Sequence, residues 1–445
     1  MNDSKNEQAW KQLFEKYNIC EAINKNGQYI ISSKDINKFR EARLMTKFDY
    51  RFQLPHILAE KRLSILPISR GEYVLSNIET FEDLKNTPNL EIIEFSMPSY
   101  IESLDFSTIT SEAMAINCAY ISNIIGDFTE DDKLIPTVNG RMSSQSFDFK
   151  IQKTENDNSY LQVKVQNAQV EIDGGYEGAT SLNLIEAKNN LSSDFLIRQL
   201  YYPYRLWESR INKIVRPIFL IYTNGIFHLR EYKFDELANY NSITLVKEKK
   251  YRLKNSSSYI INTQTIQEIL HTISIIKEPT GVPFPQADSF ERVINLCEIL
   301  YNNSSCKHTK CSLSASYDFK QRDSFEMRQV SYYTDAAIYL GLIKKESTLS
   351  NGYYFKLTPT GETLFTAKSI SERQLIFIKA ILSHKVFNET LKLYLKKAEE
   401  PSKKEIVTIM KTANLQNVCA ETTFWRRAST VLSWVNWILN SIEEE

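Results

Sequence analysis

The chain has 445 residues, 42% hydrophobic and 12% aromatic, which is enough for about three domains with full cores. The 54 basic and 54 acidic side chains cancel, and six scattered cysteines are typical of reduced thiols rather than of a disulfide framework. No apolar run approaches the ~20 residues of a membrane span, and the N-terminus lacks the apolar core of a secretory signal. We therefore expect a cytoplasmic globular protein without a membrane partner.

Charge is uneven along the N-terminal part of the chain. Residues 30–70 hold nine Lys/Arg against four Asp/Glu, whereas residues 71–132 hold thirteen acids and one base. Within the basic stretch, four cations fall three or four apart and are predicted to share one face of a helix: Arg40, Arg43, Lys47 and Arg51. Such a stripe suits the phosphate oxygens of DNA. The alternative is that each charge block is a solvated helix face.

Helices with loops are predicted over residues 5–60, followed by two short strands. Residues 110–128 predict a helix with Ser111 as its N-cap and Glu112 in its first turn, where an acid is also favoured by the helix dipole alone. Residues 145–152 and 160–172 then predict a hairpin.

The most informative stretch follows that hairpin. Its second strand runs into a Gly-Gly pair at 174–175, which predicts a tight turn, and a second apolar strand covers residues 182–187. Asp173 is expected at the turn, and Glu186 and Lys188 at the end of the second strand. Side chains two residues apart on a strand point to the same face, so Glu186 and Lys188 are predicted to project together.

These residue types suit phosphodiester hydrolysis. Carboxylates hold Mg²⁺, which keeps several waters, and a neighbouring lysine orients the attacking water or steadies the phosphate. Acid-x-Lys triplets recur elsewhere in the chain, but only the one at Glu186 ends an apolar strand that follows a Gly-Gly pair and another acid. Glu171 and Glu177 remain alternatives to Asp173 as the first acid.

At this point the chain resembles the PD-(D/E)xK nuclease superfamily, and among its branches the type II restriction endonucleases. The resemblance implies Asp173 as the first acid, Glu186 as the second and Lys188 as the lysine, with the two acids binding Mg²⁺. It also implies a further metal contact from Glu112. The chain departs from the pattern at Ile172, where the family has a proline.

A helix is predicted after the lysine strand, and Pro203 should kink or divide it. Gln199, with Tyr202 close by, resembles the glutamine-tyrosine element of part of this superfamily, which implies that Gln199 holds a metal-bound water or a phosphate. The alternative is a polar residue on the helix surface. Strands 215–222 and 226–234 follow, joined by a Thr-Asn-Gly hairpin turn.

The C-terminal half begins with a predicted linker over 251–286. Helices 288–301 and 324–341, then a hairpin around Ser350-Asn351-Gly352, resemble a winged helix, which also occurs as a protein-binding module. The second helix would enter the major groove and supply four candidate readers of DNA: Arg328, Gln329, Tyr332 and Tyr333. Residues 370–445 predict a further helical module with Arg426 and Arg427 near the start of its last long helix.

We therefore expect an α/β (α+β) protein with a restriction-endonuclease-like mixed sheet flanked by helices. Five regions are predicted: an N-terminal basic region 1–110, an endonuclease core 111–250, a linker 251–286, a winged helix 287–369 and a helical module 370–445. The expected activity is Mg²⁺-dependent, sequence-specific cleavage of double-stranded DNA by a homodimer that forms at least on DNA. The system would include a cognate DNA methyltransferase. The alternatives are the end-cleaving subunit of a heteromeric transposase, or a winged-helix regulator with an inactive nuclease fold.

Overall fold

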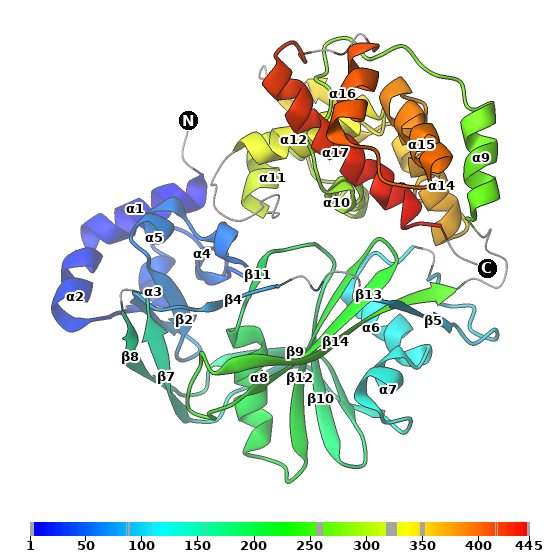
Figure 1. Cartoon of the computed structure of the whole chain (residues 1–445). Coiled ribbons are helices and arrows are strands. Elements are labelled where there is room, and N and C mark those ends of the chain that lie inside the picture. Colours follow the sequence, from blue (N-terminus) through cyan, green and yellow to red (C-terminus); the bar gives the residue numbers. More distant parts are fainter. Residues whose placement is uncertain are drawn as a thin grey trace. The chain divides into compact units, whose positions relative to one another are not determined.

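The computed structural model describes residues 4–442 except 86, 88, 89, 107, 155, 255–260, 317–326, 348–351, 414 and 416. The chain forms two compact units (Figure 1). Unit 1 comprises residues 1–95, 111–222 and 226–252, and unit 2 comprises residues 96–110, 223–225 and 253–445. The regions predicted as N-terminal region and nuclease core thus belong almost entirely to one compact unit.

Unit 1 starts with short helices that bury Trp10 and Leu13 and pack against a small antiparallel sheet of order β1-β3-β2. The helices are α1 (Lys5–Lys16), α2 (Ile19–Asn26), α3 (Ser33–Ile36), α4 (Ala42–Thr46), the 3-10 helix η1 (Arg51–Gln53) and α5 (His56–Glu60). The strands are β1 (Tyr29–Ser32), β2 (Ser64–Pro67) and β3 (Glu72–Ser76).

The predicted basic helix face is wrong, because this stretch is broken into short pieces. Arg40 lies in the turn between α3 and α4, where the Asn37 side chain accepts a hydrogen bond from Ala42 N at 2.7 Å. Lys47 follows α4 in extended conformation, and Arg51 begins η1. The four cations therefore do not form one helical stripe.

The centre of unit 1 is a seven-stranded mixed sheet of order β5-β14-β13-β12-β10-β9-β6, in which β10 and β12 pair in parallel. Its strands are β5 (Ile92–Ser96), β6 (Ile135–Ser143), β9 (Gln169–Glu177), β10 (Ser181–Lys188), β12 (Ile214–Thr223), β13 (Ile226–Phe234) and β14 (Ile243–Lys254). Two smaller pairs join it: β7 (Phe147–Lys153) with β8 (Asn156–Val165), and β4 (Phe81–Asp83) with β11 (Asp194–Leu196).

Helices flank β9 and β10. Figure 1 shows α8 (Arg198–Glu208) on one side of these strands and α6 (Glu112–Ile121) with α7 (Ile124–Thr129) on the other. The single helix predicted over 110–128 is interrupted by Asn123, whose φ of 64° is left-handed. Conversely, Pro203, which was predicted to kink or divide the helix, does not divide it: α8 continues through this residue. The mixed sheet flanked by helices is as predicted at this level of description.

The predicted Gly-Gly turn is wrong. β9 continues through Gly174 and Gly175, and the turn comes later, where Gly178 N donates to Ser181 O at 2.9 Å. A Cβ on Gly175 would lie 2.6 Å from Val138 Cβ, so the glycine permits the close approach of β6. The predicted linker is also shorter than expected, because β14 reaches Lys254 and a helix, α9 (Thr263–Thr272), follows.

Unit 2 is mostly helical, around an apolar core that includes Phe387 and Trp434. Its other helices are α10 (Phe290–Asn302), α11 (Lys310–Ser316), α12 (Met327–Tyr339), α13 (Pro359–Thr363), α14 (Ile370–Leu382), α15 (Lys385–Lys397), α16 (Lys403–Lys411) and α17 (Glu421–Leu439). An antiparallel pair, β15 (Ile343–Ser347) with β16 (Tyr353–Leu357), follows α12, and the predicted hairpin tip lies outside the described residues except for Gly352. Among the described residues, no helix combines the length and apolarity needed to cross a membrane.

Candidate active site

The candidate site lies where strands β9 and β10 separate. Their antiparallel ladder ends at the pair Gly174–Ile185, one residue before Asp173 and Glu186 would face each other. Beyond that pair, the Asp173 carboxylate takes the place of the backbone: its Oδ2 accepts a hydrogen bond from Ala187 N at 3.0 Å. The position of Asp173 is therefore fixed against the strand that carries the second acid and the lysine.

Glu186 and Lys188 project together, as predicted from their spacing. Lys188 Nζ lies 2.6 Å from Glu186 Oε1, and both side chains are 9% exposed. Each charge is buried, so the pair compensates in part for the loss of hydration. Asp173, Glu186 and Lys188 are thus assembled by one strand edge.

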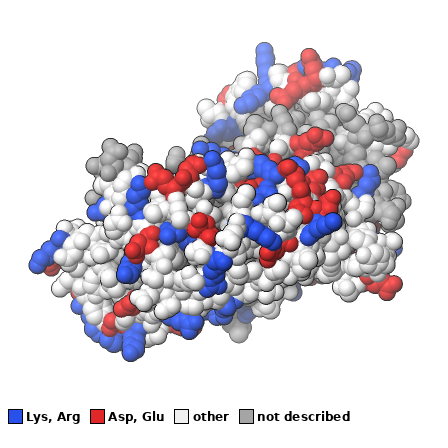
Figure 2. Space-filling view, turned by 90° about the horizontal axis from the view of Figure 1, so that it is seen from below, with Lys and Arg blue, Asp and Glu red and all other residues white. Residues whose placement is uncertain are grey.

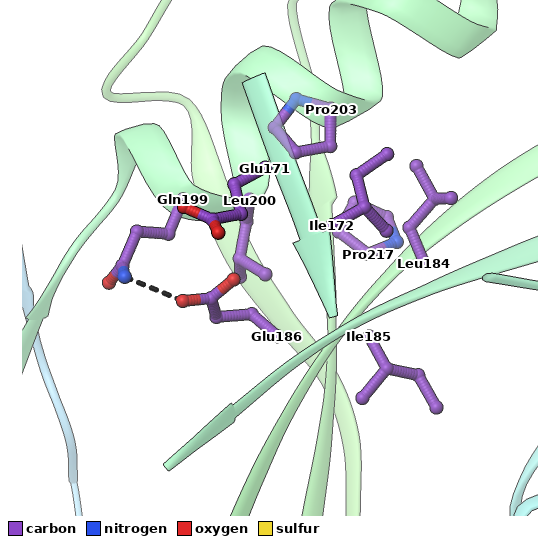
Figure 3. A pocket seen from close by; sticks show the side chains of 9 residues that line it. All are labelled: Glu171, Ile172, Leu184, Ile185, Glu186, Gln199, Leu200, Pro203 and Pro217. Carbon is purple, nitrogen blue, oxygen red and sulfur yellow. Dashed lines mark hydrogen bonds between the residues drawn. The ribbon is translucent and has the colours of Figure 1, made fainter. Parts of the chain in front are cut away.

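Gln199, in the first turn of α8, faces the same acids. Its Nε2 donates to Glu186 Oε1 at 2.6 Å and to Asp49 Oδ1 at 3.3 Å. Its Oε1 is buried and has no hydrogen-bond partner in the described part of the chain. In Figure 3 the polar ends of Gln199, Glu171 and Glu186 lie on one side, and the apolar side chains Ile172, Leu184 and Ile185 on the other.

Glu112 approaches from the first turn of α6. When the Asn189 amide is oriented to satisfy its surroundings, its oxygen accepts hydrogen bonds from Glu112 N (3.0 Å) and Ser111 N (3.3 Å). This contact ties the start of α6 to the residue that follows Lys188. Glu112 lines the same cavity of about 130 Å³ as ten other residues: Lys47, Val170, Glu171, Asp173, Glu186, Lys188, Arg198, Gln199, Tyr202 and Pro203.

Burial and mutual charge shift the ionisation of this cluster. Burial raises the pKa of Glu186 to about 7, with Asp173 adding to the shift and Lys188 opposing it. Burial alone would lower the pKa of Lys188, but the carboxylates of Glu186 and Asp49 outweigh it and raise that pKa well above its ordinary value. Burial also raises the pKa of Glu112. A cavity-lining cluster of perturbed groups is typical of functional sites.

The alternative first acids have other partners. Glu177 forms an ion pair with Lys213 at 2.6 Å near the far end of β9. Glu171 lines the cavity but forms an ion pair with Arg141 at 3.1 Å. Only Asp173 is hydrogen-bonded to β10 between the second acid and the lysine, so we retain it as the first acid.

Sequence reasoning missed two residues of this site. Asp49 reaches Gln199 and lies 4.0 Å from Lys188 Nζ through its Oδ2, although it is about 140 positions away in the chain. No local pattern marks Asp49, which is one of four acids among nine bases. Arg198 lines the cavity beside Gln199, and its position next to the glutamine was the only available signal. Of the predicted basic stripe, Lys47 alone lines the cavity.

The other predicted DNA contacts are scattered. Arg51 forms ion pairs with Asp194 (3.2 Å), Asp83 (2.9 Å) and Glu79 (3.2 Å), which makes it an anchor inside unit 1 rather than a free cation. Arg43 is exposed, and the side chain of Arg40 is half-buried.

In unit 2, Tyr333 is 1% exposed and belongs to the core, so its prediction as a reader of bases is wrong. Arg427 is also buried, at 9% exposed, while Arg426 beside it is exposed. Gln329 and Tyr332 are half-buried on α12, and the side chain of Arg328 lies outside the described residues.

The donor set suits a hard divalent cation that keeps much of its water. Among the described residues, no three His, Cys, Asp or Glu side chains gather closely enough to enclose a metal ion. Mg²⁺ does not require such a cage, because it is commonly held by one or two carboxylates together with waters and phosphate oxygens. Asp173 and Glu186 provide two carboxylates at the cavity, and Gln199, whose buried Oε1 has no hydrogen-bond partner in the described part of the chain, lines it as well.

Three family models match the chain, each over less than half its length. All are described as domains of unknown function: DUF6996 over residues 7–75, DUF6997 over residues 76–252 and DUF7226 over residues 292–443. No curated protein and no solved structure matches the chain. Asp173, Glu186, Lys188 and Gln199 fall within the second match, whereas Asp49 falls within the first.

Proposed function

We propose that the protein hydrolyses phosphodiester bonds of double-stranded DNA with Mg²⁺, as a sequence-specific restriction endonuclease of type II. The observation that carries the proposal is the meeting of Asp173, Glu186, Lys188 and Gln199 at the point where β9 and β10 separate. This combination of two acids, a lysine and an amide around a cavity supports catalysis more than it supports a regulator with a decayed site.

Each residue has a distinct task in the proposed reaction. Asp173 and Glu186 would hold Mg²⁺, which would supply positive charge for the phosphate and lower the pKa of a bound water. Lys188, whose raised pKa keeps it protonated, stabilises the negative charge that develops on the phosphate. The Oε1 of Gln199 accepts a hydrogen bond from the attacking water and orients it. Lys47 and Arg198 add positive charge to the cavity lining for the phosphate group.

The choice of DNA and of sequence specificity rests on the resemblance and on unit 2. Three helices followed by an antiparallel strand pair (α10, α11, α12, β15, β16) have the order of a winged helix, which reads the major groove with its last helix. The partly exposed side chains of Gln329 and Tyr332 on α12, with Arg426 on α17, are the candidate contacts. A restriction enzyme of this type would work in the cytoplasm beside a cognate DNA methyltransferase. On the face shown in Figure 2, Lys/Arg and Asp/Glu are interspersed rather than separated into two fields.

The experiment is digestion of plasmid and phage DNA by the purified full chain with Mg²⁺, followed by sequencing of the ends. Glu186→Ala and Asp173→Ala should each lower cleavage by on the order of 10²–10³-fold or more, because each removes a metal ligand. Binding of DNA in Ca²⁺ should change little. Glu177→Ala is the matched control, since it removes an acid from β9 that pairs with Lys213 outside the cavity. Full activity of Glu186→Ala would refute the site, and defined fragments with common ends are required for the sequence-specific part.

The proposal also includes a homodimer on DNA. One such site breaks one strand, and two-fold related subunits match the symmetry of a palindromic duplex. Mixing the wild-type protein with an excess of Glu186→Ala should therefore yield nicked circles from mixed pairs. Linear product without accumulation of nicks at every ratio would exclude the requirement for two copies.

A further inference from the structure

An N-terminal segment, residues 47–53, is attached to the connection between the lysine strand and α8. Leu196 N donates to Asp49 O at 2.9 Å, and Asp49 N donates to Gln53 Oε1 at 2.8 Å. Arg51 N donates to Asp194 Oδ1 at 2.8 Å. These bonds fix the backbone on both sides of Asp49, so its side chain has little freedom to leave the site.

The guanidinium of Arg51 strengthens this attachment. Its ion pairs reach Asp194 on β11, Asp83 on β4 and the nearby Glu79. Strands β4 and β11 pair with each other, with Asp83 opposite Asp194. Arg51, which was predicted to contact DNA, therefore anchors the segment that contains Asp49.

Asp49 uses both carboxylate oxygens toward the site. Oδ1 accepts from Gln199 Nε2 at 3.3 Å, and Oδ2 lies 4.0 Å from Lys188 Nζ. The same amide nitrogen donates to Glu186 Oε1 at 2.6 Å, so both of its hydrogens are engaged by carboxylates. The amide consequently cannot turn over without placing its oxygen against two acids.

We propose that Asp49 is a positioning residue for catalysis, and this inference rests on the proposed nuclease function. By fixing the nitrogen of the Gln199 amide, Asp49 determines that the oxygen is the free, buried acceptor. It also places a second carboxylate 4.0 Å from the Lys188 ammonium group, which pairs with Glu186 at 2.6 Å. The lysine and the water acceptor are thus oriented before the substrate binds, which is how outer partners of a site contribute to rate.

The N-terminal region therefore has a positioning role in the site. Asp49 lies in the 7–75 match, whereas the groups it positions lie in the 76–252 match. Each of these two segments therefore supplies part of one site within unit 1. A nuclease core that lacked the first segment would retain its acids and lysine but lose the orientation of Gln199.

The test compares single-turnover cleavage and substrate affinity of full-length variants in Mg²⁺. Asp49→Leu should lower kcat by about 10–100-fold, the usual cost of losing an outer partner, and leave KM within about twofold. Asp49→Asn keeps an oxygen for the Gln199 amide but loses the charge beside Lys188, so its kcat should lie between those of the wild type and Asp49→Leu. Glu177→Gln is the matched control, because it removes a carboxylate that pairs with Lys213 outside the cavity; its kcat should equal that of the wild type.

A double-mutant cycle with Gln199→Leu decides whether Asp49 acts through the glutamine. We expect Asp49→Leu/Gln199→Leu to lose less activity than the product of the two single losses, because part of the effect of Asp49 passes through Gln199 and the remainder through Lys188. Multiplied losses would overturn the inference, as would wild-type kcat in Asp49→Leu or Asp49→Asn. Should Asp49→Leu fail to fold by circular dichroism, the cycle is run with Asp49→Asn. A wild-type protein that does not cleave DNA at all would instead refute the proposed function on which the inference depends.

Discussion

Two clusters of buried charge lie on the same sheet of unit 1 and differ in their surroundings. In the first, Glu186 and Lys188 on β10 face a cavity, and the Gln199 oxygen beside them has no partner in the described part of the chain. In the second, Arg230 on β13 pairs with Glu248 on β14 at 3.2 Å and donates to Lys85 O at 2.8 Å.

The second cluster is closed by His228, whose Nε2 lies 2.7 Å from Glu248 Oε2. Burial and the Arg230 charge lower the pKa of His228 to about 4, a shift as large as that of Glu186. A perturbed pKa therefore marks both clusters and cannot alone identify an active site. A cavity and an unpartnered acceptor distinguish the first cluster. In the second cluster the charged groups pair with one another, and their contacts connect β13, β14 and the segment around Lys85.

The largest expected effect is on stability, in the second cluster. Arg230→Met should lower the free energy of unfolding by about 3–5 kcal/mol, because it leaves Glu248 buried without its main cation. Urea denaturation measures this loss. Lys233→Met is the matched control: it lies on the same strand but is 62% exposed, and it should change stability by less than about 0.5 kcal/mol. Lost DNA cleavage by the folded fraction of Arg230→Met would show that the second cluster also serves the reaction.

In the first cluster the expected effect is on the reaction rate. Lys188→Met is expected to lower kcat by on the order of 10²–10³-fold, since no other cation lies between Glu186 and Asp49 among the described residues. Quenched-flow cleavage assays measure the rate, and denaturation shows that the variant is folded. Lys213→Met, which breaks an ion pair with Glu177 outside the cavity, should cleave at the wild-type rate. Equal activity of the two variants would remove the distinction between the clusters.

The second cluster should also make the stability of the protein depend on pH. The folded-state pKa of His228 lies near 4, below its ordinary 6.5, so its contribution to stability is present above pH 6.5 and is lost as the pH falls toward 4. The loss amounts to at most about 3 kcal/mol at 1.36 kcal/mol per pKa unit. His228→Gln keeps a donor for Glu248 but does not titrate, so its unfolding free energy should depend less on pH in this window. His271→Gln, an exposed histidine of α9, should leave the pH profile unchanged. Identical profiles for wild type and His228→Gln would contradict the assignment.

Sequence alone predicted the parts of the site that depend on local spacing. Glu186 and Lys188 share a face because alternation along a strand determines it, whereas the mixed sheet flanked by helices was what the resemblance implied for this order of elements. Gly174 and Gly175 were misread as a turn, since a glycine pair signals either a turn or close packing and only the approach of Val138 on β6 decides between them. β14 was not predicted: residues 243–250 were assigned to the core without an element and residues 251–254 to the linker, although pairing with β13 makes the whole stretch a strand.

Asp49 and Arg51 could not have been assigned their roles from sequence. Both depend on contacts across more than a hundred positions, to Gln199 and to Asp194, and neither end of these contacts carries a local signature. The basic spacing that suggested a helical DNA-binding face was real in the sequence, but the helix ends at Thr46 and the stripe is lost. A spacing of three or four residues predicts a shared helix face only where the helix spans several turns, and these helices are too short for that.

The smallest expected effect is on the stability of Arg51→Ala, and it tests whether Arg51 is a structural anchor or a DNA contact. Its side chain is 43% exposed, so solvent screens its ion pairs and Arg51→Ala should lower the free energy of unfolding by only about 1 kcal/mol. If it is the anchor, the affinity for DNA in Ca²⁺ and the slope of log K against log salt should remain those of the wild type. A phosphate contact would instead reduce that slope by about one. Arg43→Ala, which removes an exposed cation near the same segment, serves as the comparison: it should leave stability unchanged, and a phosphate contact by Arg43 would reduce its salt slope by about one. A reduced slope for Arg51→Ala with unchanged stability would indicate that Arg51 contacts DNA. It would also contradict the role of Arg51 in anchoring the segment that contains Asp49.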